Sequence, residues 1–415
     1  MPYQSNRPRR GSSPARGGVR SVGSYGRSNS GRRSGGKKGS KQFIHPSKFI
    51  NKATAYEAVA YEATHTFNDF GFSNPLMENI NRKGYTIPSA IQDQSIAHVL
   101  EGRDVIGLAN TGTGKTAAFL LPIIEKILKS NKQSKALIIA PTRELAQQIN
   151  AEFLSFAKGL KIFSATLVGG ANINYQIRDL QRRPNVIIGT PGRMKDMIER
   201  KLVKLDTIDT LVLDEADRML DMGFLPDIRS IIESLPESKQ TLFFSATITP
   251  EIEKLTRSFM QNPHTVSVRT GETSDHVEQG VVEFHDKMHK IEVLTQMLSE
   301  EEFEKVLVFG ETKFGVQRLS DHLTKIGIPS EAIHGNKSQS QRERALRNFK
   351  NKKVKVLVAT DVAARGLDIP NVSHVINFDT PQTYDDYVHR IGRTGRGGAS
   401  GQAHTFIESK QLSHR

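Results

Sequence analysis

The stretch Val105-Ile106-Gly107-Leu108-Ala109-Asn110-Thr111-Gly112-Thr113-Gly114-Lys115-Thr116 decides the fold of this chain. Its first four residues form an apolar run typical of a buried strand, and residues 117–128 have a helical pattern. Glycines between a strand and a helix let backbone N–H groups wrap around phosphates, while Lys115 offsets the phosphate charge and the Thr116 hydroxyl can ligate Mg²⁺. The stretch therefore predicts a phosphate-binding loop in an α/β domain. The loop residues are Ala109, Asn110, Thr111, Gly112, Thr113, Gly114, Lys115 and Thr116.

The loop departs from the usual pattern at one position, because Ala109 stands where the first glycine is common. A flexible turn without a ligand is the alternative interpretation. The strand before the loop and the helix after it favour the phosphate-binding interpretation.

Short apolar, β-branched runs alternate with helical patterns on both sides of the loop. They lie at residues 105–108, 136–140, 185–188, 210–213 and 241–244. The pattern fades near residues 263–276 and restarts at residues 281–282, 305–309, 354–358 and 374–376. Runs of this kind predict parallel sheets covered by helices on both faces. We therefore expect two tandem, doubly wound α/β domains joined by a short linker.

The expected organisation has six parts. They are a basic tail (residues 1–48), a pre-core segment (49–66), a first domain that contains the phosphate-binding loop (67–268), a linker (269–276), a second domain (277–410) and a C-terminal end (411–415).

The charge of the 415-residue chain is concentrated in its tail. Residues 1–48 contain twelve Lys or Arg and no Asp or Glu, which leaves 46 basic and 44 acidic residues elsewhere. A Gly-, Ser- and Arg-rich segment buries too little apolar surface to fold, so we expect a disordered tail whose cations bind phosphates. A solubilising tail is one alternative. An organellar transit peptide is another, but the glycines disfavour its amphipathic helix.

Composition excludes several classes of chemistry. The chain has no cysteine, so it has no disulfide, thiolate zinc site or cysteine nucleophile. It also lacks an apolar run of about 20 residues and the apolar segment of a secretory signal. We therefore expect a cytoplasmic protein that has no membrane partner.

The strand at residues 210–213 ends directly in Asp214-Glu215-Ala216-Asp217. Ligands of open α/β folds bind at the carboxyl edge of the sheet, where these carboxylates are expected. Asp214 is suited to holding Mg²⁺, and Glu215 to orienting or deprotonating water. Acidic residues also favour a helix start, which is the alternative when the motif is taken alone.

Two further motifs are interpreted together with the phosphate-binding loop and the acidic motif. Ser245-Ala246-Thr247 ends the strand at residues 241–244 and can hydrogen-bond the carboxylates, relaying nucleotide state. The segment His389-Arg390-Ile391-Gly392-Arg393-Thr394-Gly395-Arg396 concentrates arginines that can stabilise charge on a transferring phosphoryl group. A basic nucleic-acid face is the alternative for that segment.

Together these motifs resemble the DEAD-box family of RNA helicases, and the resemblance covers about Phe67 to Ile407. It implies two RecA-like domains, ATP and Mg²⁺ as ligands, and RNA-dependent ATP hydrolysis. The implied activity is local, non-processive RNA unwinding or ribonucleoprotein remodelling. The resemblance makes Lys115, Asp214, Glu215, Arg393 and Arg396 catalytic. It assigns Asp217, Ser245, Ala246, Thr247 and His389 to coupling between ATP and RNA.

The resemblance also implies how adenine and ribose are bound. Phe67 and Tyr85 match the family's aromatic positions, with Tyr85 stacking on adenine, and Gln92 reads the edge of the base. Asp368 would hold the ribose.

The RNA positions implied by the resemblance are backbone contacts without sequence preference. In the first domain they are Pro141, Thr142, Arg143, Gly169, Gly170, Thr190, Gly192 and Arg193. In the second domain they are Thr312, Gln341, Arg344, Thr360 and Gly366. A helix-start charge for Arg143 and an exposed helix residue for Gln341 are the simpler alternatives.

The chain departs from the family pattern at three places. Asn110 stands where relatives have Gln or Glu, Ser89-Ala90 replaces Thr-Pro, and Gly310-Glu311 precede Thr312 where Arg or Asn is common. The last departure changes the residues directly before an expected RNA contact, Thr312.

Two other functions are compatible with parts of the sequence. The tail alone would suit an ATP-independent RNA chaperone, and paired parallel-sheet ATPase domains also serve DNA helicases. We expect a monomeric core with ribosomal or ribonucleoprotein partners. The motifs do not identify the physiological RNA, because the expected contacts are to the RNA backbone.

Overall fold

The computed structural model describes residues 44–51, 61–110, 112–131, 133–268, 277–364, 369, 371–395 and 401–412. The tail up to residue 43 and the predicted linker lie outside these residues. None of the helices in the described ranges is long and apolar enough to cross a membrane.

The first domain is a seven-stranded parallel sheet in the order β3-β4-β2-β5-β6-β1-β7 among the described residues. Its strands are β1 (Val105–Ala109), β2 (Ala136–Ile139), β3 (Ser164–Leu167), β4 (Val186–Gly189), β5 (Thr210–Leu213), β6 (Gln240–Ser245) and β7 (His264–Val268). The five strand runs predicted for this domain are confirmed as β1, β2, β4, β5 and β6.

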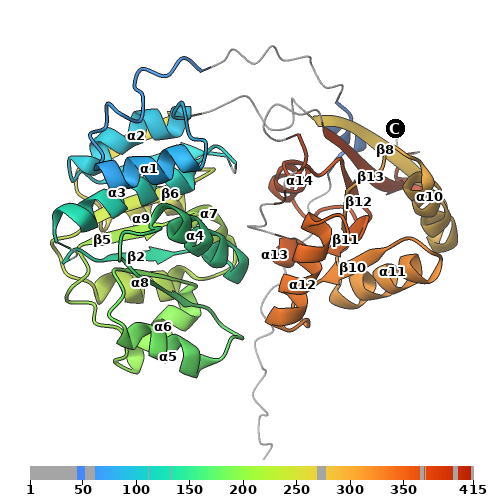
Figure 1. Cartoon of the computed structure of the whole chain (residues 1–415). Helices are drawn as coiled ribbons and strands as arrows, with labels where there is room; N and C mark the ends of the chain where they lie inside the picture. The colour runs from blue at the N-terminus through green and yellow to red at the C-terminus, as the bar shows by residue number, and fades with distance from the viewer. Residues whose placement is uncertain are drawn as a thin grey trace, which may run out of the picture. The chain divides into compact units, whose positions relative to one another are not determined.

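Helices cover both faces of this sheet (Figure 1). On one face lie α1 (Asn74–Arg82), α2 (Ala90–Leu100), α3 (Lys115–Lys129) and α4 (Arg143–Phe156). On the other lie α5 (Ile173–Gln181), α6 (Pro191–Glu199), α7 (Ala216–Asp221), α8 (Leu225–Glu233) and α9 (Pro250–Arg257). Successive residues of β1 alternate between the two cores, as the period of a strand requires: Val105 packs in one and Ile106 in the other.

The second domain is a six-stranded parallel sheet in the order β10-β11-β9-β12-β13-β8 among the described residues. Its strands are β8 (Val277–Phe284), β9 (Val306–Phe309), β10 (Ser330–Ile333), β11 (Val356–Ala359), β12 (His374–Asn377) and β13 (Gly401–Glu408). Its helices are α10 (Lys287–Ser299), α11 (Lys313–Lys325), α12 (Gln339–Lys350), α13 (Asp361–Ala364), α14 (Tyr384–Ile391) and α15 (Ser409–Leu412). The prediction of two doubly wound parallel-sheet domains is confirmed.

The two sheets have the same strand order. Reading β8 as the counterpart of β1, β9 of β2 and so on to β13 and β6, the second sheet repeats the first without its seventh strand. The carboxyl ends of β1, β6 and β5 are therefore adjacent, as are those of β8, β13 and β12. This is the edge at which ligands of open α/β sheets bind.

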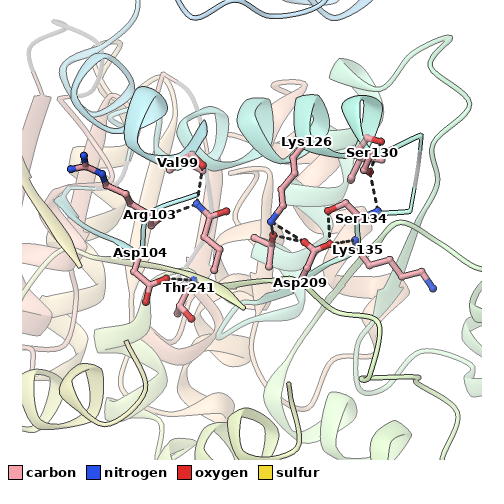
Figure 2. A network of polar contacts seen from close by, with 12 residues as sticks. Val99, Arg103, Asp104, Lys126, Ser130, Ser134, Lys135, Asp209 and Thr241 are labelled. Carbon is pink, nitrogen blue, oxygen red and sulfur yellow. Dashed lines mark hydrogen bonds and ion pairs between the residues drawn. The ribbon is translucent and has the colours of Figure 1, made fainter. Parts of the chain in front are cut away.

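Polar side chains fasten the opposite, amino-terminal edge of the first sheet (Figure 2). Asp209, just before β5, accepts hydrogen bonds from the Ser134 hydroxyl at 2.6 Å and from the Lys135 N–H at 3.1 Å, and pairs with Lys126 at 3.0 Å. Asp104, just before β1, accepts the Thr241 N–H at 2.7 Å. These bonds satisfy backbone N–H groups where strands begin, so they stabilise the end of the sheet opposite the ligand-binding edge.

The N-terminal boundary differs from the prediction of a disordered tail through residue 48. Pro46–Phe49 form a 3-10 helix, and Phe49 is buried in a core of the second domain with its ring 4.8 Å from that of Tyr387. Asn51 pairs antiparallel with Gln279 of β8. The prediction was wrong for residues 44–48 because burial of one aromatic side chain offsets the ordering entropy of a short segment.

Candidate ATP and RNA sites

The phosphate-binding loop connects β1 to α3. Gly112 and Gly114 have φ angles of 87° and 93°, in the left-handed region that glycine reaches without strain. Among the described residues, no side chain caps the N-terminus of α3, so its first-turn N–H groups remain open to an anion. Thr111 lies outside the described residues.

Lys115 is the first residue of α3 and is buried. Its ammonium donates a hydrogen bond to the carbonyl of Ala109 at 2.8 Å, and the Thr113 hydroxyl donates to the Asn110 carbonyl at 2.8 Å. These internal bonds hold the loop in a curved shape. Ala109 ends the strand and is buried, so the position at which the loop departs from the usual pattern is a packed strand residue.

Gln92 and Ser89 hold this loop from the side. The Gln92 amide donates to the Gly114 carbonyl at 3.1 Å and accepts the Ser89 N–H at 3.0 Å, while the Ser89 hydroxyl donates to the Thr113 carbonyl at 2.7 Å. A Cβ at position 114 would lie 2.4 Å from the Gln92 nitrogen. The segment expected to read adenine is therefore bonded to the segment expected to bind phosphates, and Ser89 fills the place of the usual threonine as helix cap.

The two aromatic residues expected near adenine lie together. The ring of Phe67 is buried and lies 6.0 Å from that of Tyr85. The Tyr85 hydroxyl donates to Glu152 at 3.2 Å, and burial, with the Glu152 charge, raises the pKa of Tyr85. Tyr85 is thus held neutral with its ring against the same core as Phe67.

Asp93 was missed by the sequence analysis. Its carboxylate accepts the Tyr61 hydroxyl at 2.6 Å and the N–H groups of Thr64 and His65 at 2.8 and 3.1 Å. Burial would raise the pKa of Asp93, but these hydrogen bonds outweigh it and hold the pKa below its usual value. The carboxylate binds the segment that leads into Phe67 onto the helix that carries Gln92. An acidic residue directly after Gln92 was the only signal in the sequence.

The acidic motif follows β5. The Asp214 carboxylate is buried and accepts the Glu215 N–H at 3.0 Å. Glu215 has φ 52° and ψ 50°, a left-handed conformation that is costly for a residue with a Cβ. The backbone therefore turns sharply at the residue expected to act on water. The alternative of an acidic helix start is also realised, because α7 begins at Ala216.

Electrostatics distinguish the three acids. Burial, opposed by the Lys115 charge, raises the pKa of Asp214 to about 7. Burial would also raise the pKa of Asp217, but the charges of Lys115 and Arg218 reverse the effect and lower it. Glu215 forms a buried ion pair with Arg218, with 2.7 Å between Nη1 and Oε2. Arg218 was not predicted, although it follows the acidic motif directly.

Asp217 joins the acidic motif to the end of β6. One carboxylate oxygen accepts the N–H groups of Ala246 and Thr247 at 3.0 Å each and the Thr247 hydroxyl at 3.2 Å. The Ser245 hydroxyl donates to the Thr247 carbonyl at 2.7 Å. The predicted coupling residues of the first domain are therefore brought together, at the strand end between the acids and the phosphate-binding loop.

Expected RNA positions of the first domain lie in the loops after β2, β3 and β4 and in the first turns of α4 and α6. Thr142 follows Pro141 and caps α4 by accepting the Leu145 N–H at 3.2 Å. Arg143 packs over the glycine pair, since a Cβ at Gly170 would lie 2.2 Å from its guanidinium. After β4, Thr190 is the N-cap of α6, Gly192 lies in its first turn, and Arg193 pairs with Asp196 at 3.7 Å.

In the second domain, two of the described RNA positions cap helices. The Thr312 hydroxyl accepts the Gly315 N–H at 3.0 Å at the start of α11, and Gln341 forms a capping box with Ser338. Thr360 is buried after β11, and Arg344 is exposed on α12. Gly366 and Asp368 lie outside the described residues.

Arg390 is buried and pairs with both carboxylate oxygens of Asp361, at 2.5 and 2.7 Å. It also donates to the Asp379 carbonyl at 2.6 Å. Sequence analysis placed Arg390 in the arginine segment without a role. Its role here is structural, because it ties α14 to the ends of β11 and β12.

Arg393, a predicted catalytic residue of the segment 389–396, is buried just after α14. Its Nε donates to the His389 carbonyl at 3.3 Å. Arg396 lies outside the described residues. The pocket on this side of the second domain is lined by Phe309, Asp361, Ala364, Asp386, His389, Arg390 and Arg393.

The fold and the loop place the chain among P-loop ATPases built from two parallel-sheet domains. The DEAD/DEAH box helicase family model matches residues 89–255, and the model of the helicase conserved C-terminal domain matches residues 289–398. The chain therefore belongs to the DEAD-box family of ATP-dependent RNA helicases, which are RNA-stimulated ATPases.

Relatives agree with this assignment. The chain is 47% identical over 349 residues to the ATP-dependent RNA helicase CshA of Limosilactobacillus reuteri, covering 84% of this chain and 70% of that protein. It is 46% identical over 351 residues to the DEAD-box ATP-dependent RNA helicase CshA of Bacillus subtilis, covering 84% and 71%. These matches favour an RNA helicase over an ATP-independent chaperone or a DNA helicase.

Solved structures show the same fold. S. cerevisiae Dbp5 bound to RNA and ADP BeF3 is 31% identical, with a TM-score of 0.74, and the match covers 83% of this chain and 90% of that one. Mss116p bound to ssRNA and AMP-PNP is 32% identical, with a TM-score of 0.75, and the match covers 83% and 74%.

Proposed function

We propose that this helicase hydrolyses ATP at the adjoining ends of β1, β6 and β5 and uses each turnover for local, non-processive RNA unwinding or ribonucleoprotein remodelling. The observation that carries the proposal is the uncapped N-terminus of α3, whose Lys115 is buried within reach of the charges of Asp214 and Asp217. A positive helix end and an ammonium attract phosphates, and a buried acidic cluster beside them suits hydrolysis.

The loop would bind the phosphates through the N–H groups from Asn110 to Thr116, while Lys115 offsets the β/γ charge. Tyr85 would stack on adenine beside Phe67, and Gln92 would read its edge. The Gln92 amide retains a second N–H and a second lone pair beyond the two bonds it makes to the loop. Base recognition and loop shape would therefore depend on the same side chain. Asp368 would hold the ribose.

The donor set beside Lys115 fits Mg²⁺. Thr116 and Asp214 offer hydroxyl and carboxylate oxygens, which Mg²⁺ prefers. Burial raises the pKa of Asp214 to about 7, so a cation would favour its ionised form. When bound, Mg²⁺ supplies positive charge that offsets the charge developing on the phosphate oxygens.

Glu215 would orient the attacking water and accept its proton. Its carboxylate is held by Arg218 at 2.7 Å, and its backbone is fixed in the left-handed turn. Both the side chain and the backbone of Glu215 are therefore positioned before ATP binds. A pre-positioned base avoids the cost of ordering a side chain during the reaction. Arg218 would share Glu215 with the water and limit its movement.

Coupling would run through Asp217. Its carboxylate binds Ala246 and Thr247, so a change at the γ-phosphate that moves the acidic motif also moves the end of β6. From the second domain, Arg393 and Arg396 would stabilise charge on the transferred phosphoryl group, and His389 would contribute to coupling. ATP and RNA together would bring the two domains into this arrangement.

RNA would be held by its phosphates and 2′-hydroxyls through residues in the loops and helices of both domains. The first-domain contacts are Pro141, Thr142, Arg143, Gly169, Gly170, Thr190, Gly192 and Arg193; those of the second are Thr312, Gln341, Arg344, Thr360 and Gly366. A strand bent between the domains leaves its A-form partner, and hydrolysis then releases it. We propose a monomeric core that works in the cytoplasm on ribosomal or other ribonucleoprotein particles.

Replacing Glu215 by glutamine tests the proposed chemistry. Glu215→Gln keeps the size and most hydrogen bonds of the side chain but removes the base, so steady-state ATP hydrolysis should fall by about 10²- to 10⁴-fold. ATP and RNA binding should persist, and the variant should accumulate as a stable complex with both. Glu233→Gln, an exposed change on α8, is the control and should leave turnover unchanged. Unchanged ATPase activity in Glu215→Gln would exclude the assigned role of Glu215.

A further inference from the structure

Helix α5 carries a polar and aromatic surface that the proposed site does not use. Tyr175 is 61% exposed, and the guanidinium of Arg178 lies 4.4 Å from the centre of its ring. Arg182 and Arg183 follow at the end of the helix and are also exposed. We name Tyr175, Arg178, Arg182 and Arg183 the α5 surface.

The α5 surface is firmly attached to the loop that contains Gly169 and Gly170. Gln176 is buried, and its amide accepts the Val168 N–H at 3.2 Å and donates to the Val168 carbonyl at 3.0 Å. Both backbone groups of the residue before Gly169 are therefore bonded to α5. Asn172 caps the helix by accepting the Asn174 N–H at 2.9 Å.

Packing fixes the direction in which the surface points. Ile173 and Ile177 pack against the core of the first domain, and Tyr175 and Arg178 on the same helix are exposed. The guanidinium of Arg143 packs over Gly170 at the other end of the same loop. One rigid unit thus links a proposed RNA contact to an exposed aromatic ring.

The chemistry of the surface suits a nucleic-acid strand. Three arginines face one acid, Asp179, whose contact with Arg182 is long at 3.7 Å and exposed at both ends. Such a pair contributes little and leaves the surface positively charged. An exposed aromatic ring with arginines beside it allows a base to stack while the cations contact phosphates.

We propose that the α5 surface binds the single-stranded RNA flank that continues beyond the contacts at Gly169 and Gly170. Tyr175 stacks on a base, and Arg178 and Arg182 contact the phosphates beside it. This contact lengthens the RNA footprint of the first domain and rests on the proposed function, because it extends the strand bound there.

The test compares RNA of two lengths in the presence of a non-hydrolysable ATP analogue. A strand of about 6 nucleotides spans the loop contacts alone, and one of about 14 reaches the α5 surface. The variant Tyr175→Ala/Arg178→Ala should weaken binding of the long strand about tenfold, as expected for one lost stacking contact. Affinity for the short strand should not change. Fluorescence anisotropy measures both.

Two more variants identify the interaction. Tyr175→Phe should bind the long strand like the wild type, because stacking requires the ring and not the hydroxyl. Arg178→Glu should weaken long-strand binding and flatten its salt dependence by about 0.7 in log–log slope for each lost phosphate contact. Leu154→Ala/Arg257→Ala removes an exposed apolar side chain and an exposed arginine elsewhere on the same domain, and should leave both affinities unchanged.

The outcomes separate this inference from the proposed function. Equal affinity of wild type and Tyr175→Ala/Arg178→Ala for the long strand would overturn the inference while leaving RNA-stimulated hydrolysis intact. Equal weakening on both lengths would overturn it too, since the change would then act on the loop of Gly169 and Gly170. Failure of RNA to stimulate ATP hydrolysis by the wild-type chain would instead reject the proposed function.

Discussion

The two domains have the same strand order but differ at the helix that follows their equivalent strands. After β1, α3 begins with Gly114 as N-cap and no side chain closes its first turn. After β8, Asp286 closes the first turn of α10 by accepting the N–H groups of Met288 and His289 at 2.8 and 3.0 Å. A carboxylate of the protein thus occupies in the second domain the position that a phosphate would take in the first.

The acids that follow β5 and its counterpart β12 differ in a similar way. After β5, Asp214 is a buried carboxylate whose pKa burial raises. After β12, Asp379 pairs with Lys290 at 3.0 Å and also accepts the Glu311 N–H at 2.9 Å. Its carboxylate is satisfied within the second domain. The comparison indicates that the proposed catalytic site lies where the helix start has no side-chain cap and a buried lysine adjoins buried acids. The second domain instead closes the helix start with Asp286 and pairs Asp379 with Lys290.

The largest expected effect comes from the two lysines that begin the equivalent helices. Lys115 begins α3 and is buried, whereas Lys287 begins α10 and is exposed. Lys115→Ala should lower RNA-stimulated ATP hydrolysis by about 10³-fold, because it removes a buried charge aimed at the phosphates. Lys287→Ala should hydrolyse ATP at the wild-type rate. Steady-state phosphate release with saturating RNA measures both.

An equal loss of activity in Lys115→Ala and Lys287→Ala would contradict the functional difference between the two helix starts. It would mean that the start of α10 also takes part in hydrolysis. Lys115→Ala removes both the charge and the hydrogen bond to the Ala109 carbonyl, so it could lose activity simply by unfolding. Lys115→Arg therefore serves as a second variant. It retains a cation and should fold but remain impaired, because a guanidinium does not replace a point charge at a phosphate.

A smaller effect is expected from a half-buried histidine in the second sheet. His404 lies on β13 with its Nε2 buried and without a hydrogen-bond partner, and burial, then the charge of His374, lowers its pKa to about 4. The unfolded chain binds this proton below about pH 6.5, and the folded chain only near pH 4. The stabilisation is therefore complete above pH 6.5 and is lost as the pH falls toward 4, by up to about 3 kcal/mol.

Hydrogen exchange of peptides from β12 and β13 measures this loss, after correction for intrinsic exchange rates. Between pH 7 and pH 5 their protection should fall by about 2 kcal/mol. In His404→Gln the fall should be much smaller, because the titrating group is gone. His264→Gln on β7 of the first domain is the control. Equal pH dependence in His404→Gln and the wild type would contradict the assignment.

The sequence predicted features that depend on local pattern. Apolar runs predicted five strands of the first sheet and four of the second, and the glycines predicted the loop at Lys115, because both signals lie within a few consecutive residues. The runs did not predict β3, β7, β10 and β13. Asp93 and Arg390 escaped prediction since their roles depend on partners distant in sequence, Tyr61 for one and Asp361 for the other. Hydrogen-bond partners of this kind are set by tertiary packing, which periodicity does not describe.

The N-terminal boundary was mispredicted for the same reason. Composition favoured disorder through residue 48, but Phe49 packs on Tyr387 and Ile44 lies against the same core. A single aromatic anchor does not change the average composition of a window. Its burial site is provided by Tyr387 and by residues of β8 and β13, all more than two hundred positions away, so the contact has no local signature.

The smallest expected effect tests the cap that distinguishes the two domains. Asp286→Ala should speed hydrogen exchange at Met288 and His289, because their N–H groups lose the carboxylate, while Asp286→Ser retains a capping oxygen and most of the protection. Their two hydrogen bonds hold the pKa of Asp286 below its usual value, so wild-type protection there should decline only in strongly acidic buffer.

Neither variant should bind a second ATP in equilibrium dialysis. An open helix end attracts phosphate, but Phe284-His285-Asp286 contains no glycine that would let N–H groups wrap around a phosphate. If Asp286→Ala did bind a second nucleotide, the cap alone would account for the difference in nucleotide binding between the two domains.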